Sequence, residues 1–269
     1  MKTVFRVISI AIIFGLALSA CGGGNAVSVT PTVGLPLPGN PATPSENLPP
    51  TMGSSDLCMN AYYPVKANAT WVYSSSGAPS GPYEYGETIS EVRLDGFTAT
   101  TAIKQVPHAQ VWSCRPEGLT ATTLIGNNVA AILAVRRFSD AVLTNISGVT
   151  LPATMAPGSV WTYEADFTAT QVEFGVASPV AGHIKLTYTA GDHESVSVPA
   201  GTFEAIAVTI VSETKYTTQT PNGPQALSLN SSYVYWYALN VGWVKANGSG
   251  KLGGAEYFET IELVQYTIQ

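Results

Sequence analysis

Alternation of apolar and polar residues with a period of two is the feature that most restricts how this sequence folds. The pattern is clear at residues 184–189, where Ile, Leu and Tyr alternate with Lys and Thr, and at 233–238, where tyrosine takes every second position. Successive side chains of a strand point to opposite faces of its sheet, so this period predicts half-buried strands. Residues 206–216 and 257–268 are expected to be strands as well. The sequence therefore predicts an all-β or mainly β domain with antiparallel strands.

Short clusters of turn-forming residues separate the predicted strands. They lie at 95–96 (Asp-Gly), 190–192 (Ala-Gly-Asp), 221–223 (Pro-Asn-Gly) and 247–248 (Asn-Gly). Asn, Asp and Gly accept the positive φ that tight turns need, so each cluster predicts a turn. Residues 129–143 are ambiguous, because their alanine-rich apolar run suits either a helix or a buried strand, and we favour a strand.

The tryptophans mark an internal repeat within the globular part. Trp71 and Trp161 each stand two residues before a tyrosine. Later in each half, a glycine begins a predicted strand. Further on, a second tryptophan stands six residues before another glycine. The members of the later landmarks are Gly96 and Gly201, Trp112 and Trp236, and Gly118 and Gly242. This order predicts a duplication with halves at 58–150 and 151–269, forming either two packed sheets or one curved sheet. Trp71 and Trp161 are expected to lie in the core.

Charge argues against a nucleic-acid binder. Only 11% of the residues are charged and the formal net charge is −6. Binding to a phosphate backbone requires clustered Lys and Arg to displace counterions. The sequence has no long basic run, so nucleic acid is not an expected partner.

The N-terminus resembles the signal sequence of a bacterial lipoprotein. Residues 1–20 combine two basic residues, an apolar run and small residues before Cys21. Leu-Ser-Ala-Cys at 18–21 resembles a lipobox, which implies that the Cys21 thiol carries acyl chains after cleavage. An ordinary signal peptide and an uncleaved membrane anchor are the alternatives. The resemblance implies a lipid-anchored envelope protein, with Gly22 favouring the outer membrane if the cell has one, and otherwise the outer face of the cytoplasmic membrane.

Residues 21–57 are expected to form a disordered tether. The segment is rich in proline and glycine and carries no aromatic residue. Such a composition buries too little surface to offset the entropy of ordering. A docked N-terminal arm is the alternative. Residues 58–269 then form the globular domain, held away from the membrane by the tether.

Cys58 and Cys114 are the only cysteines of the globular part. Disulfides persist in the compartments that exported proteins reach, so a structural bridge between the two is predicted. A redox or metal-binding pair is the weaker alternative, because the sequence has no Cys-x-x-Cys motif.

No motif of a known catalytic class is present, so we expect a non-enzymatic protein without a cofactor or catalytic residue. A metal site at His183 and His193 is one alternative, since a hairpin turn at 190–192 would bring them together near Asp192 and Glu194. Charged residues near turns are more often solvated, and no metal site is predicted. His108 lies in no ligand pattern.

Three motifs resemble a known group of proteins. They are Val-Pro-Ala-Gly-Thr-Phe at 198–203, Tyr-Ala-Leu-Asn-Val-Gly-Trp-Val-Lys at 237–245 and Glu-Leu-Val-Gln-Tyr at 262–266. Together they are similar to uncharacterised bacterial lipoproteins with a half-barrel domain like that of the lipoprotein carriers LolA and LolB. The resemblance implies a curved antiparallel sheet with a concave face. Asn240 departs from the pattern, because glycine is usual at that position.

An apolar concave face must be covered, so we expect it to bind a lipid or another hydrophobic ligand. One alternative is an interaction module of the envelope, in which exposed tyrosines at 233–237 contact a protein or glycan. A less favoured alternative is an envelope hydrolase with a polar cluster in a cleft. An apolar pocket of about several hundred cubic ångströms would favour the first hypothesis, the absence of a pocket would favour the second, and a cleft lined by carboxylates or histidines would favour the third.

Overall fold

The computed structural model describes residues 56–78, 81–103, 106–125, 128, 138–173, 176–220, 223–252 and 255–269. The predicted signal sequence, Cys21 and residues 21–55 of the predicted tether lie outside these ranges, as do residues 129–137 of the ambiguous segment. Within the described ranges no helix is long and apolar enough to cross a membrane.

One short 3-10 helix and thirteen strands make up the described secondary structure. They are η1 (Asp56–Cys58), β1 (Thr70–Ser76), β2 (Tyr83–Val92), β3 (Gly96–Ile103), β4 (Val106–Arg115), β5 (Gly118–Ala121), β6 (Phe138–Gly148), β7 (Leu151–Pro152), β8 (Val160–Glu173), β9 (Val176–Val198), β10 (Gly201–Thr220), β11 (Gly223–Ala238), β12 (Gly242–Leu252) and β13 (Ala255–Thr267).

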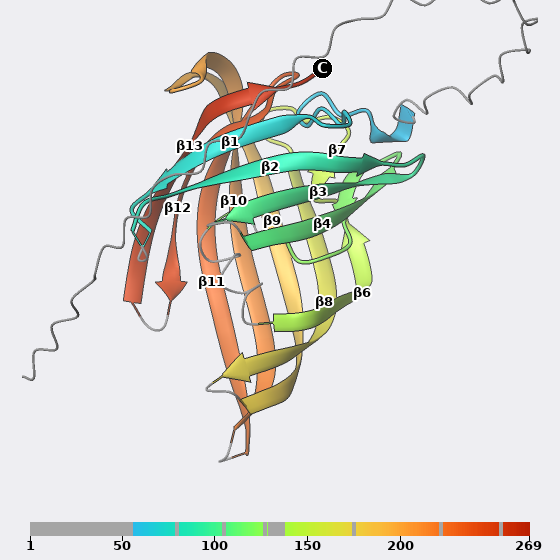
Figure 1. Cartoon of the computed structure of the whole chain (residues 1–269), viewed down its shortest axis with the longest axis vertical. Coiled ribbons are helices and arrows are strands. Elements are labelled where there is room, and N and C mark those ends of the chain that lie inside the picture. Colours follow the sequence, from blue (N-terminus) through green and yellow to red (C-terminus); the bar gives the residue numbers. More distant parts are fainter. Residues whose placement is uncertain are drawn as a thin grey trace, which may run out of the picture. The chain divides into compact units, whose positions relative to one another are not determined.

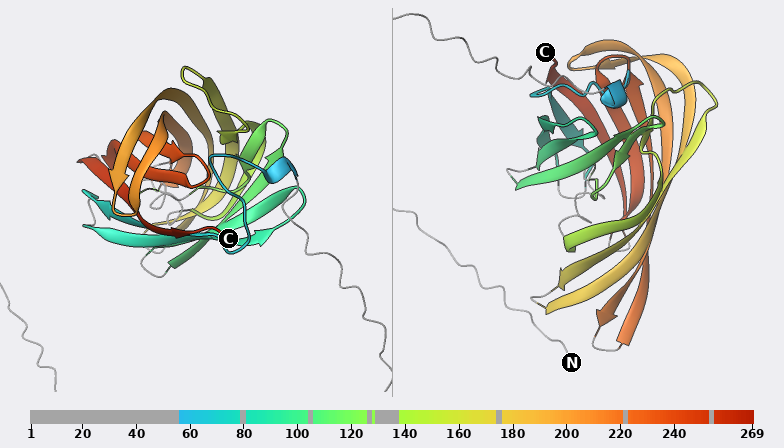
Figure 2. Two further views of the ribbon diagram at one scale, coloured as in Figure 1. Left: turned by 90° about the horizontal axis from the view of Figure 1, so that it is seen from above. Right: turned by 90° about the vertical axis from the view of Figure 1, so that its right-hand side faces the viewer.

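All thirteen strands belong to one antiparallel sheet in the order β6-β8-β9-β10-β11-β12-β13-β1-β2-β3-β4-β5-β7. The sheet is curved and does not close, as Figures 1 and 2 show: β1 to β4 cross the view of Figure 1, while β9 to β11 run down it. The prediction of a mainly β domain with a curved antiparallel sheet is confirmed. Of the two arrangements considered, the single curved sheet is the one observed.

The pairing of β1 with β13 joins the start of the globular domain to its end. Thr70 lies opposite Thr267, and the register shifts once, between Val72 and Tyr73. Such an irregularity increases the local bend and twist of a strand. The pairing therefore continues the curvature of the sheet from the C-terminal strands into the N-terminal ones.

The predicted strands at 184–189, 206–216 and 233–238 are confirmed, and the one predicted at 257–268 is observed up to Thr267. The turn predicted at 190–192 is wrong, because β9 continues through it with only a register shift against β10. That shift lets a glycine and an aspartate remain in a strand as a bulge. The ambiguous segment is a strand from Phe138 onward.

The turn predicted at 247–248 is also wrong, because Gly248 lies within β12 beneath the ring of Tyr233. Alanine at this position would place its Cβ against ring carbons of Tyr233, which donates a hydrogen bond to the buried Glu259. The glycine is required here by close packing rather than by a turn.

Gly248→Ala is therefore expected to lower the free energy of unfolding by about 1–3 kcal/mol, the usual effect of overpacking. Gly86→Ala is the matched control, since its Cβ would meet only the Trp71 carbonyl oxygen, at 3.8 Å. Urea denaturation of both variants measures the difference. Equal stability of the two variants would contradict the packing role of Gly248.

The landmarks of the predicted repeat fall on equivalent strands of two five-stranded meanders. Strands β1 to β5 form one and β8 to β12 form the other. The aligned residues Asn68 and Gly158 have φ values of 63° and 82°. Each donates its backbone N–H over 2.9 Å, Asn68 to Ile89 and Gly158 to Ala190. These matching details accompany the predicted duplication, which itself stays a prediction.

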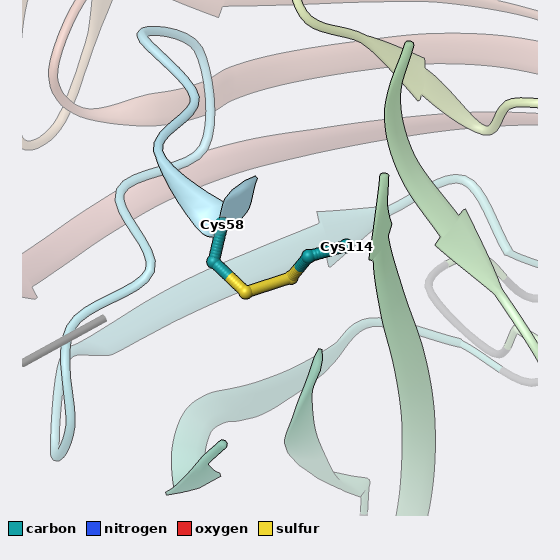
Figure 3. The surroundings of a disulfide bond; sticks show 2 residues. All are labelled: Cys58 and Cys114. Atoms are coloured by element: carbon teal, nitrogen blue, oxygen red, sulfur yellow. A yellow bond between two sulfur atoms is a disulfide. The ribbon is translucent and has the colours of Figure 1, made fainter. Parts of the chain in front are cut away.

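Residues 56–69 precede β1, and we call them the cap segment. Cys58 in η1 forms a disulfide with Cys114 in β4, with the two Cα atoms 5.0 Å apart (Figure 3). Asn60 donates its amide to the Pro152 carbonyl at 2.9 Å. The backbone N–H of Asn240, which has the left-handed φ that glycine usually adopts, donates to Ala61. The cap segment is thereby fixed to three parts of the sheet.

Candidate functional site

The candidate site is a cavity of about 200 Å³ bounded by the cap segment and the sheet. Its described apolar and aromatic lining includes Trp112, Leu119, Leu124, Ile125, Phe138, Leu143, Leu151, Tyr163, Phe167, Ile184, Leu186, Tyr188, Ile210, Leu229, Tyr233, Tyr235, Tyr237 and Trp243. Most of these side chains come from alternating strand positions, as the period of two predicts. The lining is mainly apolar, as the ligand-binding hypothesis expects, but the cavity is smaller than the several hundred cubic ångströms expected, and one carboxylate, Glu87, lies in its lining.

Contacts between aromatic rings hold two lining residues of the cavity, Tyr235 and Trp243. The rings of Tyr73 and Trp243 stack with centroids 3.8 Å apart and planes 3° apart. Tyr235 meets Trp243 edge-on at 5.3 Å. Tyr73, Tyr235 and Trp243 are all buried. Close ring contacts of this kind restrict side-chain motion, so this part of the wall is firmly placed.

The tyrosines of β11 do not form the exposed contact surface that the interaction-module hypothesis used. Tyr233 and Tyr235 are 3% and 2% exposed, and Tyr237 is half-buried. All three line the cavity. That part of the alternative hypothesis is wrong, because the tyrosines occupy the inward-facing positions of their strand.

A buried carboxyl group, that of Glu87, lies on the cavity wall. Its side chain is on β2, 4% exposed, and accepts a hydrogen bond from the Tyr63 hydroxyl of the cap segment. Burial raises the pKa of Glu87, while the hydrogen bond from Tyr63 opposes that rise. Burial likewise raises the pKa of Tyr63.

A second buried carboxyl group, Glu259 on β13, holds strands together. It accepts hydrogen bonds from Ser75 at 2.7 Å, Tyr83 at 2.5 Å and Tyr233 at 2.9 Å. These donors come from β1, β2 and β11, so a single side chain ties both sides of the β1–β13 junction. The hydroxyl oxygens of Tyr233 and Tyr257 also lie 3.3 Å apart.

The raised pKa of Glu87 predicts a pH-dependent stability. Above the unfolded value of about 4.5, the folded state binds more protons than the unfolded state until the pH passes the raised folded pKa. Stability is therefore lost as the pH rises through that window. Glu87→Gln keeps an acceptor for Tyr63 but does not ionise, so its stability relative to wild type should increase from about pH 4 to about pH 8.

Urea denaturation at both pH values measures this change. Glu84→Gln is the matched control, because Glu84 lies on the same strand with its side chain exposed. A constant difference between wild type and Glu87→Gln across the pH range would contradict the role given to Glu87.

The histidines do not come together as the metal hypothesis required. His183 lies opposite Asp166 in β8, with Nδ1 2.8 Å from Oδ1, and its Nε2 is 3.9 Å from Glu164. His193 lies opposite Ile206 in β10. The hairpin that would have joined the two histidines is absent because β9 runs straight through the expected turn. In the part of the chain that the structure describes, no group of three His, Cys, Asp or Glu side chains is placed to hold a metal ion.

His108 and the two anchor tryptophans have structural contacts. His108 Nε2 lies 2.8 Å from the Leu124 carbonyl oxygen. Trp71 is 1% exposed and donates to the Val241 carbonyl at 2.7 Å, and Trp161 stacks on Tyr188. Trp71 therefore lies in the core as predicted, while Trp161 is partly buried against it.

Neither buried carboxyl group was predicted from the sequence. Glu87 is in phase with Tyr83, Tyr85 and Ile89, and Glu259 follows Tyr257 by two residues, so each glutamate occupies an inward-facing position. The sequence does indicate them in one way: each glutamate stands at a position where the alternation of its strand places apolar, inward-facing residues. Cys58 and Cys114 are joined as predicted.

Comparison with known proteins gives a partial family match. Residues 189–255, from within β9 to the start of β13, match the family described as DUF3108-like. No curated protein sequence matches the chain. The resemblance to the lipoprotein carriers stays a prediction.

Two solved structures are similar to the chain. One, described as a candidate exported protein with a YmcC-like fold from Bacteroides fragilis NCTC 9343, has a TM-score of 0.47 and 13% identity and covers 78% of this chain and 100% of its own. The other, a candidate lipoprotein from Parabacteroides distasonis ATCC 8503, has a TM-score of 0.44 and 14% identity. This match covers 78% of this chain and 99% of that one.

Proposed function

We propose that this chain is a non-enzymatic, lipid-anchored protein of the cell envelope whose curved sheet binds a hydrophobic molecule. The cavity of about 200 Å³, lined mainly by aromatic and aliphatic side chains, is the observation that carries the proposal. An apolar cavity of about 150 Å³ is already large enough to take up benzene, so this volume suits a small aromatic molecule or part of an alkyl chain.

The proposed place of action follows from the predicted lipidation of Cys21. Acyl chains on this cysteine would hold the protein at the outer membrane, or at the outer face of the cytoplasmic membrane in a cell without one. Residues 21–57 would then separate the binding domain from the lipid surface. A hydrophobic ligand is plentiful in that setting.

Binding of the uncharged fluorescent probe N-phenyl-1-naphthylamine tests the proposal. The protein used is the secreted full-length Cys21→Ser variant, which needs no detergent. Leu186→Trp places a larger side chain into the cavity, and Val211→Trp makes a comparable change at an exposed position of the neighbouring strand β10. We expect saturable binding that Leu186→Trp weakens about tenfold or more and Val211→Trp leaves unchanged. Equal binding by both variants would place the probe elsewhere and contradict the proposal.

A further inference from the structure

Four large apolar side chains are exposed outside the strands of the sheet. Leu57 and Met59 in the cap segment, Leu94 between β2 and β3, and Leu239 between β11 and β12 are between 44% and 66% exposed. In the part of the chain that the structure describes, every other exposed large apolar side chain belongs to a strand. Turns and connecting segments are normally polar, so these four residues need a separate explanation.

The disulfide brings Leu94 close to the two exposed apolar residues of the cap segment. The carbonyl oxygen of Asp95, the residue after Leu94, accepts a hydrogen bond from the backbone N–H of Cys114 at 2.7 Å. Cys114 is bonded to Cys58, which stands between those two residues of the cap segment. Figures 1 and 2 likewise show η1 beside the turn that joins β2 to β3.

A backbone hydrogen bond joins the region of Leu239 to the same cap segment. The next residue, Asn240, donates its N–H to the carbonyl oxygen of Ala61 at 2.6 Å, and Ala61 is two residues beyond Met59. All four side chains therefore lie around the cap segment, at one end of the domain. We call this set, Leu57, Met59, Leu94 and Leu239, the apolar rim.

The charges beside the apolar rim balance. Residues 58–69, 91–95 and 115–117 contain three basic and three acidic residues. They are Lys66, Arg93 and Arg115, and Glu91, Asp95 and Glu117. Arg93 is already paired with Glu91, with Nη1 2.5 Å from Oε2. A partner of the rim therefore gains little from charge and is held mainly by burial of apolar side chains.

The predicted lipid anchor joins the domain at this same end. The predicted tether runs from Cys21 to residue 57, and the described chain begins at Asp56, next to Leu57. An extended chain of this length spans at most about 110 Å at about 3.1 Å per residue. Confinement to such a distance gives the bilayer a high effective concentration, so even a weak contact between rim and lipid is frequently formed.

We propose that the apolar rim inserts into the surface of the bilayer that carries the lipid anchor, so that the domain docks with its cap segment toward the lipid. This inference rests on the lipid anchoring of the proposed function and is independent of ligand binding in the cavity. Apolar side chains gain free energy at the boundary between headgroups and acyl chains, and this gain needs no anionic lipid. Docking brings the cap segment, one boundary of the cavity, to the lipid surface.

Co-sedimentation of the secreted full-length Cys21→Ser protein with phosphatidylcholine vesicles tests this docking. Leu94→Asp combined with Leu239→Asp places two charges in the rim. Val172→Asp combined with Val176→Asp is the matched control, because both valines are exposed and flank the connection between β8 and β9. We expect the rim pair to weaken vesicle binding about tenfold or more and the control pair to leave it unchanged. This difference should persist at high ionic strength, since it does not depend on charge attraction.

Binding of N-phenyl-1-naphthylamine by the same variants separates the two proposals. None of the four substituted residues belongs to the described cavity lining, so both pairs should bind the probe as the Cys21→Ser protein does, which also shows that they are folded. Absence of probe binding from the Cys21→Ser protein itself overturns ligand binding and leaves the docking standing.

Three results would overturn the docking. They are vesicle binding that is absent, vesicle binding that both pairs reduce equally, and a difference between the pairs that disappears at high ionic strength. If the rim pair instead dissociates a dimer of the Cys21→Ser protein and leaves vesicle binding unchanged, the rim is a contact between copies of the chain, and the docking is likewise overturned.

Discussion

Replacing Cys58 and Cys114 together by alanine is expected to lower the free energy of unfolding by about 4 kcal/mol. The disulfide closes a loop with a sequence separation of 56 residues, and the chain-entropy model gives about this value for a loop of that length. The bridge also fixes the cap segment, which supplies the Tyr63 hydrogen bond to Glu87. Loss of the bridge should therefore weaken probe binding as well as stability.

Urea denaturation of the double variant and of wild type, both without reductant, measures the effect. Adding reductant should lower the stability of wild type but not that of the double variant. A stability difference below about 1 kcal/mol would contradict a structural role for the bridge.

Cys21→Ser is expected to move the protein from the membrane fraction to the soluble exported fraction. The predicted acyl chains depend on the cysteine thiol, and several chains on one residue make membrane binding effectively permanent. Serine is similar in size but cannot form the thioether. Cell fractionation followed by immunoblotting measures the distribution.

Cys58→Ala combined with Cys114→Ala is the control for this experiment, because it changes cysteines of the globular domain and leaves the lipobox intact. Whatever remains folded of this variant should stay with the membrane. Retention of Cys21→Ser in the membrane fraction would contradict lipid anchoring and favour an uncleaved N-terminal anchor.

The alternation of apolar and polar residues predicted most of the strands, because the period of two of a half-buried strand can be seen within a short stretch of sequence. It failed where a glycine served packing instead of a turn. Gly248 follows Asn247, the usual composition of a two-residue turn, but the glycine is needed beneath the Tyr233 ring contributed by β11. That ring comes from a different strand, so the local sequence did not reveal the reason.

The cavity was harder to predict than the strands. Its lining includes Tyr63, Glu87, Gln110 and Trp112, which meet only because β2, β3 and β4 pair in a particular register beneath the cap segment. The pairing of β1 with β13 is likewise set by contacts between distant parts of the chain. The sequence shows only that Glu87 falls on the same face of its strand as the apolar residues around it.

Native mass spectrometry of the secreted full-length Cys21→Ser protein tests the central claim most directly. The protein is measured as isolated, and any bound molecule is then extracted into organic solvent and identified. The account predicts an added mass near one molecule per chain, due to a hydrophobic compound and absent from Leu186→Trp. An empty mass for wild type, or the same bound compound on Leu186→Trp, would contradict it.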